Sequence, residues 1–334
     1  MANTNILEAI GRRRFIKGAG ALVAGAGLSI PPAAAQTGSS PIHLQVGFPP
    51  GGSGDLFARI LGDALRAELG RTLIIENKPG AGGLTVATGF LRAPKDGSVL
   101  MLATGSTAVS APISRAIPPY NPVDDFAWIA LLSNAPFVIA VNPELPATDL
   151  KSLIAYLKAR PHQLSYGHAG LGTTVHLAAE LFKERAGVDV VDIPYPGSAG
   201  AITATIGGTV AFIVETSGTL LPFHKAGKLR ILATFAEARE KITPEIPTAR
   251  EAAGIDVVAG TSNLLAAPLG TPPEIIDTLA RAVGRVMSQS AIQQKLVALG
   301  IQPFTNSNPE QARAYVAKEV ARWTPVVKKL GIAL

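Results

Sequence analysis

The sequence of 334 residues contains no cysteine, and this absence excludes several classes of protein at once. Without thiols there is no disulfide framework, no thiolate metal site, no cysteine nucleophile and no lipid-modified cysteine. Charged residues make up only 16% of the chain, below the usual value of about a quarter, while apolar residues reach 47%. A disordered chain or a coiled coil needs more charge and fewer aliphatic residues, so this composition indicates a globular protein.

Aromatic residues are also scarce, at 5%, although the formal net charge of +6 raises the question of nucleic-acid binding. Half of that charge lies in residues 1–35, where four basic residues accompany Glu8. The other half is spread along the chain, and its densest basic stretches are 225–230 and 328–329. Nucleic-acid sites need clustered basic residues and aromatic rings for stacking, so we expect no nucleic-acid partner.

Residues 1–35 have the pattern of an export signal. A basic stretch at 12–17 precedes an apolar run at 18–30, and small residues follow at 31–35. The apolar run of 13 residues is too short to span a bilayer, and no later run reaches about 18 apolar residues. The order R-R-x-F-I-K resembles a twin-arginine signal, and an ordinary secretory signal with three arginines is the alternative. Cleavage after Ala35 leaves 299 of the 334 residues.

The remaining chain alternates between apolar segments of strand length and amphipathic segments of helical period. This alternation predicts an α/β fold with two mostly parallel sheets flanked by helices, and about 299 residues exceed what one core usually organises, so we expect two domains. The expected strands are 42–48, 72–76, 98–104, 128–132, 137–141, 163–166, 188–193, 210–214 and 229–234. The expected helices are 55–69, 149–159 and 218–226, two ending near 92 and 186, one opening at 198, one capped by a 271–274 capping box and one starting at 308–309.

Motifs of known enzyme classes are missing from the sequence. Residues 52–57 and 80–85 fail the G-x-G-x-x-G pattern at the third glycine, and no phosphate-binding loop, G-x-S-x-G or H-E-x-x-H motif occurs. His168 and His176 approach each other if the loop between them folds back, but no carboxylate motif completes a metal site. We therefore expect hydrogen-bonding roles for both histidines, no metal, no cofactor and no enzymatic activity.

Four loops rich in Gly, Ser and Thr each stand between an expected strand and a helix: 51–55, 104–107, 168–173 and 197–198. Small residues leave main-chain N–H groups open, and a helix N-terminus adds several donors and the positive end of a dipole. Loops of this kind that face one cleft hold a carboxylate without Lys or Arg. The alternative is ordinary helix capping by Asp55, Thr173 and Ser198.

The order and spacing of short segments from residue 41 to residue 331 resemble one family closely. The chain is similar to the substrate-binding proteins of tripartite tricarboxylate transporters, the Bug-type periplasmic solute receptors. The segments that carry the resemblance are FPPGGSGD (48–55), IENKPGAGG (75–83), APKDG (93–97), NPELP (142–146), GLGT (170–173), HL (176–177), ELFK (180–183), IPY (193–195), KAGKLR (225–230) and IPT (246–248).

This resemblance implies a two-domain periplasmic binding protein fold that closes on its ligand like a flytrap, with crossing hinge strands between the domains. Domain 1 is expected at 41–141 plus 261–334, and domain 2 at 142–260. The implied function is capture of a small organic carboxylate in the cleft between the domains and its delivery to the membrane subunits of the transporter. The protein is then expected to be a periplasmic monomer without a lipid anchor.

The resemblance also implies a set of ligand-binding positions. By matching position, these are Phe48, Gly52, Ser53 and Asp55 in the first loop, Thr104, Ser106 and Thr107 in the second, His168, Ala169, Gly172 and Thr173 in the third, and Gly197 and Ser198 in the fourth.

This chain departs from the family at His168, Pro196 and Glu215, and all three are expected at the cleft. We add Glu215 to the candidate ligand-binding residues. A His donor and a Glu acceptor favour a ligand with an amino or hydroxyl group besides its carboxylate. The alternative is that both side chains bond only the loop backbone.

Two other functions remain open on the sequence alone. One is an exported enzyme that acts on a small carboxylate, and the other is a ligand-sensing partner of a two-component sensor.

Overall fold

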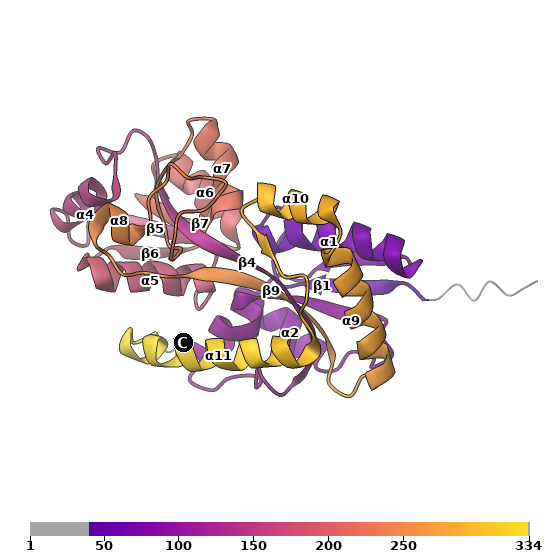
Figure 1. Ribbon diagram of the computed structural model, residues 1–334. Coiled ribbons are helices and arrows are strands. Elements are labelled where there is room, and N and C mark those ends of the chain that lie inside the picture. The colour runs from indigo at the N-terminus through magenta and orange to yellow at the C-terminus, as the bar shows by residue number, and fades with distance from the viewer. Residues whose placement is uncertain (1–39, 333–334) are drawn as a thin grey trace, which may run out of the picture. The chain divides into compact units, whose positions relative to one another are not determined.

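The computed structural model describes residues 40–332, all of which belong to one compact unit (Figure 1). The predicted export signal at 1–35 lies outside the described residues. Within 40–332, no helix combines the length and the apolar character needed to cross a membrane.

The first group of strands consists of β1 (Ile42–Val46), β2 (Leu73–Asn77) and β3 (Val99–Thr104). Strand β1 pairs in parallel with both neighbours, and helices α1 (Ser53–Leu69) and α2 (Leu84–Phe90) form the crossovers. The apolar residues of α1 recur on one face, and Phe57, Leu61 and Leu65 are buried there as their spacing predicts. Each crossover places a strand-to-helix loop at the carboxyl end of the sheet, which is where the predicted binding loops lie.

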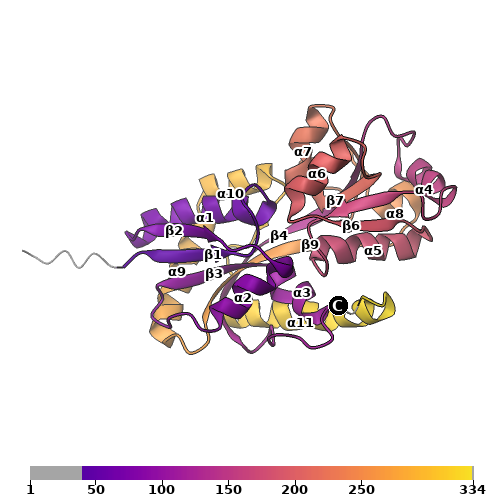
Figure 2. The ribbon, with the colours of Figure 1, turned by 180° about the vertical axis from the view of Figure 1, so that it is seen from behind.

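The second group consists of β5 (Ser165–His168), β6 (Val191–Pro194), β7 (Phe212–Thr216) and β8 (Arg230–Thr234). Strand β5 pairs in parallel with β6 and β7. The helices of this group are α4 (Leu150–Lys158), α5 (Thr174–Ala186), α6 (Ser198–Ile206), α7 (Ser217–Lys225) and α8 (Ala249–Ala253). Figure 2 shows the two groups at opposite ends of the described chain, with β4 and β9 running from one to the other.

Two long strands join the groups. Strand β4 (Phe126–Val141) pairs over residues 126–136 with β9 (Gly260–Pro268) and over 137–141 with β7 and β8. The predicted strands 128–132 and 137–141 are therefore one strand, and the prediction of a break between them is wrong. Residues 133–136 include Ser133, Asn134 and Pro136 and lack apolar alternation, but each of them still pairs with β9.

The strand pairing as a whole is mixed. Eight of the ten strands follow one path in the order β2-β1-β3-β9-β4-β7-β5-β6, and the other two, β8 and the short β10 (Gln302–Pro303), pair with β4. Pairing is parallel inside each group and antiparallel wherever β4 or β9 takes part. The predicted parallel arrangement therefore holds only for the helix-connected outer strands, because β4 and β9 pass directly between the groups without crossover helices.

The C-terminal helices α9 (Pro273–Met287), α10 (Ser290–Ala298) and α11 (Pro309–Lys329) return to the first group. The predicted capping box at 271–274 is wrong, because Thr271 Oγ1 donates to the carbonyl of Pro268 at 2.8 Å and α9 begins without a side-chain cap. The predicted start of α11 is confirmed: the Asn308 side chain accepts the N–H of Gln311 at 2.8 Å in a capping box.

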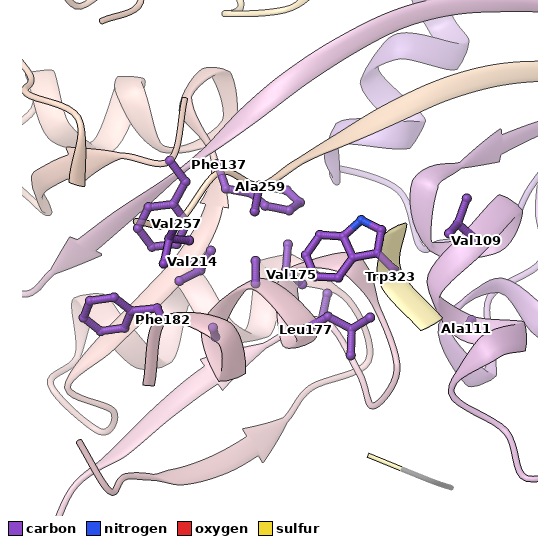
Figure 3. Close-up of a cluster of buried hydrophobic side chains, with 14 of the residues drawn as sticks. Val109, Ala111, Phe137, Val175, Leu177, Phe182, Val214, Val257, Ala259 and Trp323 are labelled. Atoms are coloured by element: carbon purple, nitrogen blue, oxygen red, sulfur yellow. The ribbon is translucent and has the colours of Figure 1, made fainter. Parts of the chain in front are cut away.

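The largest buried cluster extends through both groups on one side of β4 and β9. Figure 3 shows Trp323 of α11 between Val109, near the first group, and Val175 of α5 in the second. Phe182 and Val214 continue the cluster into the second group. The two groups are thus joined by packed side chains as well as by the two long strands.

Candidate functional site

The predicted loops surround a small cavity of about 40 Å³ between the two groups of strands. Its walls come from the ends of β1, β3 and β7, the start of α5 and α6, and the two joining strands. The lining residues are Phe48, Gly52, Ser53, Gly54, Thr104, Ser106, Phe137, Ala169, Thr173, Thr174, Val175, Ser198, Glu215 and Thr261. Small-molecule pockets typically measure about 300–1,000 Å³, so this cavity must widen to admit a small-molecule ligand.

Nine of the fourteen predicted positions line this cavity: Phe48, Gly52, Ser53, Thr104, Ser106, Ala169, Thr173, Ser198 and Glu215. The other five, Asp55, Thr107, His168, Gly172 and Gly197, do not belong to its lining. Each of these five lies on one of the four loops, so the sequence found the loops correctly but did not separate residues that face the cavity from residues that support it.

Asp55 supports the first loop from behind. Its carboxylate accepts the main-chain N–H of Gly51, the guanidinium of Arg59 and the side-chain amide of Asn77, each at 3.0 Å. Burial alone raises the pKa of Asp55, but these hydrogen bonds outweigh burial and hold the pKa below its usual value. Asn77 also donates to the carbonyl of Phe48 at 2.9 Å, so Asp55 and Asn77 together fix the loop that faces the cavity.

The first loop continues directly into α1, and the approach to β3 is very close. A Cβ added to Gly54 would lie 2.9 Å from Cγ2 of Thr104, so the position has no room for a side chain. Ser53 and Gly54 are the first residues of α1, and their N–H groups have no acceptor inside the helix. The loop therefore presents the N-terminus of a 17-residue helix to the cavity.

Ser106 connects the second loop with the second group of strands. It begins a short π-helical turn, η2 (Ser106–Ser110), that leads into α3 (Ala111–Ile113). The Oγ atom of Ser106 accepts the main-chain N–H of Thr174 at 3.0 Å and lies 3.1 Å from the Thr174 hydroxyl. Thr174 is the first residue of α5, so this contact spans the cavity at the N-terminus of a second helix.

Thr107 points away from the cavity. A Cβ added to Gly83, which ends the 3-10 turn η1 (Ala81–Gly83), would meet Thr107 Oγ1 at 2.1 Å. The Thr107 carbonyl accepts the hydroxyl of Tyr120 at 2.6 Å. Thr107 thus packs the second loop against η1.

The third loop is shaped by Thr173. Its Oγ1 accepts the N–H of His176 at 3.4 Å, which caps α5, and donates to the carbonyl of Gly170 at 2.6 Å. The capping interpretation is therefore confirmed for Thr173, which also lines the cavity. It is wrong for the other two residues, since α1 begins after Gly52 and α6 after Gly197.

His168 and His176 stack behind the third loop with ring centroids 4.5 Å apart. Their Nε2 atoms lie 3.4 Å and 4.0 Å from Oδ2 of Asp192 on β6. The ligating atoms of the three residues are within 4.8 Å of one another, close enough for a metal site. The expectation that no carboxylate completes a cluster around these histidines is therefore wrong, because the pairing of β5 with β6 brings Asp192 to them.

The hydrogen bonds of the two rings indicate that this cluster supports the third loop. The N–H of Gly172 donates to Nδ1 of His176 at 3.2 Å, whereas Nδ1 of His168 lies 3.0 Å from the carbonyl oxygen of Gly170 and 3.3 Å from its N–H. His176 therefore carries its proton on Nε2, where it has no lone pair for a metal, and Nδ1 of His168 contacts the Gly170 backbone in either tautomer. Burial lowers the pKa of both rings, that of His176 to about 4, so both are neutral at pH 7.

Ser198 and Glu215 form the fourth wall. Gly197 precedes α6 with φ +100, and Ser198 is the first residue of that helix. Glu215 ends β7 with 2% of its surface exposed. The Ser198 hydroxyl donates to its Oε2, and the N–H of Thr216 donates to its Oε1 at 2.7 Å. Burial raises the pKa of Glu215, although these hydrogen bonds act in the opposite direction.

Five lining residues were not predicted: Gly54, Phe137, Thr174, Val175 and Thr261. Gly54 and Thr174 directly follow predicted positions at a helix start, and Val175 follows Thr174. The exposed first-turn N–H groups of a helix are a signal that identifies these three residues. Phe137 and Thr261 lie on β4 and β9, and no local pattern marks them. A second, open depression of about 520 Å³ lies elsewhere, on α9, and includes Arg281 and Arg285.

Comparison with known proteins gives one consistent result. The family model described as tripartite tricarboxylate transporter family receptor matches residues 57–332. Protein BugT of Bordetella pertussis is 34% identical over 323 residues, which cover 96% of this chain and 98% of that protein.

Two solved structures match nearly all of the described chain. One, described as R. palustris Rpa4515 with adipate, is 30% identical with a TM-score of 0.85 and covers 88% of this chain and 98% of its own. Another, described as periplasmic binding protein BugD, is 30% identical with a TM-score of 0.84 and covers 88% and 99%. The predicted two-domain α/β fold of periplasmic binding proteins is confirmed by this likeness.

Proposed function

This chain belongs to the tripartite tricarboxylate transporter family of receptors, and we propose from this premise that it binds a small organic carboxylate and delivers it to the membrane subunits of such a transporter. The binding site is the cavity between the two groups of strands. The relative solved with adipate supports a carboxylate ligand, since adipate has a carboxylate at each end.

The observation that carries this proposal is the meeting of three helix N-termini at one cavity. Ser53 and Gly54 of α1, Thr174 and Val175 of α5, and Ser198 of α6 all line it. Each helix contributes main-chain donors without intrahelical acceptors and the positive end of its dipole. Such an arrangement binds an anion without a basic side chain, and the described lining contains neither Lys nor Arg.

Ligand capture in this proposal is a closure of two domains, 41–141 plus 261–334 against 142–260. β4 and β9 are the connections about which the domains move, and a ligand favours closure only as far as it binds the closed state better. Two contacts support a closed arrangement here. One is the Ser106–Thr174 pair at the cavity, and the other is the ion pair of Lys329 with Glu184 at 2.6 Å.

We propose binding without turnover. The hydroxyls of Ser53, Ser106 and Ser198 line the cavity, and Ser198 donates to the carboxylate of Glu215. A nucleophilic serine normally pairs with a histidine base that a third group orients, and no histidine belongs to the described lining. The rings of His168 and His176 are bonded to the third loop and to Asp192 and are not part of the described lining. The protein acts in the periplasm as a monomer after removal of residues 1–35, in keeping with the family's role.

The test is direct titration of the purified protein with adipate and a panel of small mono-, di- and tricarboxylates by calorimetry. At least one member is expected to bind saturably, with a rise in Tm and no product by NMR. Thr278→Ala, on the exposed face of α9 and away from the cavity, serves as the matched control for cavity variants. Absence of binding across the panel, together with an empty native mass spectrum of protein taken from its own periplasm, contradicts the proposal.

A further inference from the structure

The cavity combines three helix N-termini with one buried carboxylate, and from this combination we infer that the ligand carries a protonated amino group as well as a carboxylate. Glu215 is the partner of the amino group, and the helix N-termini bind the carboxylate. This inference rests on the proposed function, since it names the class of ligand for the same cavity.

Glu215 lines the cavity and is also almost completely buried. It stands at the end of β7, where Val138 of β4 pairs with it, and it is 2% exposed. Both of its oxygens already accept one hydrogen bond, Oε2 from the Ser198 hydroxyl and Oε1 from the N–H of Thr216. A carboxylate oxygen has two acceptor positions, so each oxygen retains capacity for a donor from the ligand.

Among residues 40–332, no cationic side chain pairs with the carboxylate of Glu215. Of the fourteen described lining residues Glu215 alone has a charged side chain. The groups that act on its pKa are burial and the hydrogen bonds of Ser198 and Thr216, and no cation of the described chain contributes. Val138 on β4 and Ser198 on α6 are uncharged, and His168, the titratable residue at the end of β5, is held neutral by burial.

Burying an ionised carboxylate without a cation costs desolvation free energy, and a cationic group on the ligand offsets this cost. A hydroxyl on the ligand satisfies an acceptor position but leaves the negative charge uncompensated. An ammonium group does both, because it supplies donors and the opposite charge. The same ligand places its carboxylate against the donors of Ser53, Gly54 and Val175, so the separated charges of the ligand match those of the cavity.

The competing chemistry is a protonated Glu215 that donates to a second carboxylate of the ligand. The two chemistries have opposite pH dependence. Binding of an amino group requires the ionised form, so affinity for an amino ligand is lost as pH falls through the pKa of Glu215. Donation to a carboxylate requires the acid form, so affinity for a dicarboxylate rises over the same range. Because burial raises the pKa of Glu215, this range lies above the ordinary value for a glutamate.

The test is calorimetric titration of the full-length mature protein with two matched pairs of probes, adipate against 2-aminoadipate and butyrate against 2-aminobutyrate. At pH 7.5 the amino compound of a pair is expected to bind at least tenfold more tightly, and this preference is expected to shrink as pH is lowered. In Glu215→Gln the preference is expected to vanish while binding of the compound without the amino group is retained.

Glu240 offers a matched control. It is a second buried glutamate with a raised pKa, it accepts the hydroxyls of Ser217 at 2.6 Å and Thr234 at 2.9 Å, and it is outside the cavity lining. Glu240→Gln is expected to keep the amino preference. If Glu215→Gln does not fold, the probe pairs and the pH series on the unaltered protein still decide the question.

The outcomes separate the two proposals. If adipate or butyrate binds but the amino group adds nothing, the amino-ligand inference is overturned and the carboxylate receptor stands. Affinity for adipate that increases on acidification, without an amino preference, overturns it in favour of the protonated glutamate. If no probe or other carboxylate binds at any pH, the proposed function itself fails.

Discussion

The N–H of Thr174, the first residue of α5, donates to the hydroxyl oxygen of Ser106 at 3.0 Å, although the two residues are 68 positions apart in the chain. Ser106 follows β3 in the first group of strands, and α5 belongs to the second. A side chain of one group thus satisfies the leading donor of a helix in the other, directly on the cavity wall. The contact couples the position of α5 to the loop after β3.

Ser106→Ala tests this coupling. The substitution removes the acceptor of a buried N–H, which is expected to lower the free energy of unfolding by about 1–3 kcal/mol, the usual cost of an unsatisfied buried donor. It is also expected to weaken carboxylate binding, because closure loses a contact between the groups. Urea unfolding and calorimetry measure the two effects, with Thr278→Ala as control. Unchanged stability and affinity in Ser106→Ala would show that the contact does not contribute to closure.

The close approach of Gly54 to Thr104 gives a second prediction. Gly54→Ala places a methyl group 2.9 Å from Thr104 Cγ2, so the start of α1 must shift away from the cavity, and affinity for the carboxylate is expected to fall at least tenfold. Gly54→Ala combined with Thr104→Ser removes the clashing methyl group and is expected to recover most of the affinity. Gly89→Ala, inside α2 with no neighbour within 4 Å, is the control and is expected to be neutral or slightly stabilising.

The buried histidines predict how stability depends on pH. The pKa of His176 is about 4 in the folded protein, against about 6.5 for an ordinary histidine. Between these values the unfolded chain binds a proton that the folded chain does not, so stability falls as pH drops from 6.5 toward 4. At about 1.36 kcal/mol per pKa unit, the loss approaches about 3 kcal/mol.

His176→Asn isolates this effect, because the Asn Oδ1 can still accept the N–H of Gly172. Unfolding by urea at pH 7.0, 6.0 and 5.0 is expected to show a shallower pH dependence in the variant than in the unaltered protein. Equal slopes in both would assign the acid sensitivity to other groups.

Asp192 distinguishes loop support from metal binding. The Asp192 carboxylate lies 3.4 Å from Nε2 of His168, and Asp192→Asn is expected to lower stability by about 1.5–3 kcal/mol, the range for a hydrogen bond to a charged group. Zn²⁺ is expected to leave the Tm of the unaltered protein unchanged, because Nδ1 of His176 accepts the N–H of Gly172 and that ring therefore has no lone pair at Nε2. A Zn²⁺-dependent rise in Tm that Asp192→Asn abolishes would establish a metal site instead.

Local chemistry explains what could be predicted from the sequence. Gly, Ser and Thr before a helix determine both the turn and the open N–H groups, so the sequence predicts the four loops that surround the cavity and nine of its lining residues. The Asn308 cap is likewise predicted from its dipeptide with Pro309. The lining residues and contacts that were not predicted depend on the pairing of strands that are distant in the sequence. Phe137 and Thr261 face the cavity because β4 and β9 pair, and Asp192 meets His176 because β6 lies beside β5.

Other predictions were wrong because a polar side chain had two possible hydrogen-bond partners and the sequence did not show which one it takes. Thr271 has the spacing of a capping residue, but its hydroxyl bonds the preceding turn at Pro268 instead. Asp55 follows a glycine-rich loop as a capping or ligand-binding residue does, yet Arg59 one helical turn later and Asn77 on β2 hold its carboxylate behind the loop. Neither partner is visible in a short sequence window.

The most direct test of the account is a crystal structure of the protein with its tightest carboxylate from the panel. The account predicts a ligand carboxylate within hydrogen-bond distance of the N–H groups of Ser53 or Gly54 and of Val175, inside the cavity that Glu215 lines. A ligand bound instead in the depression at Arg281 and Arg285, with the cavity empty, would contradict it.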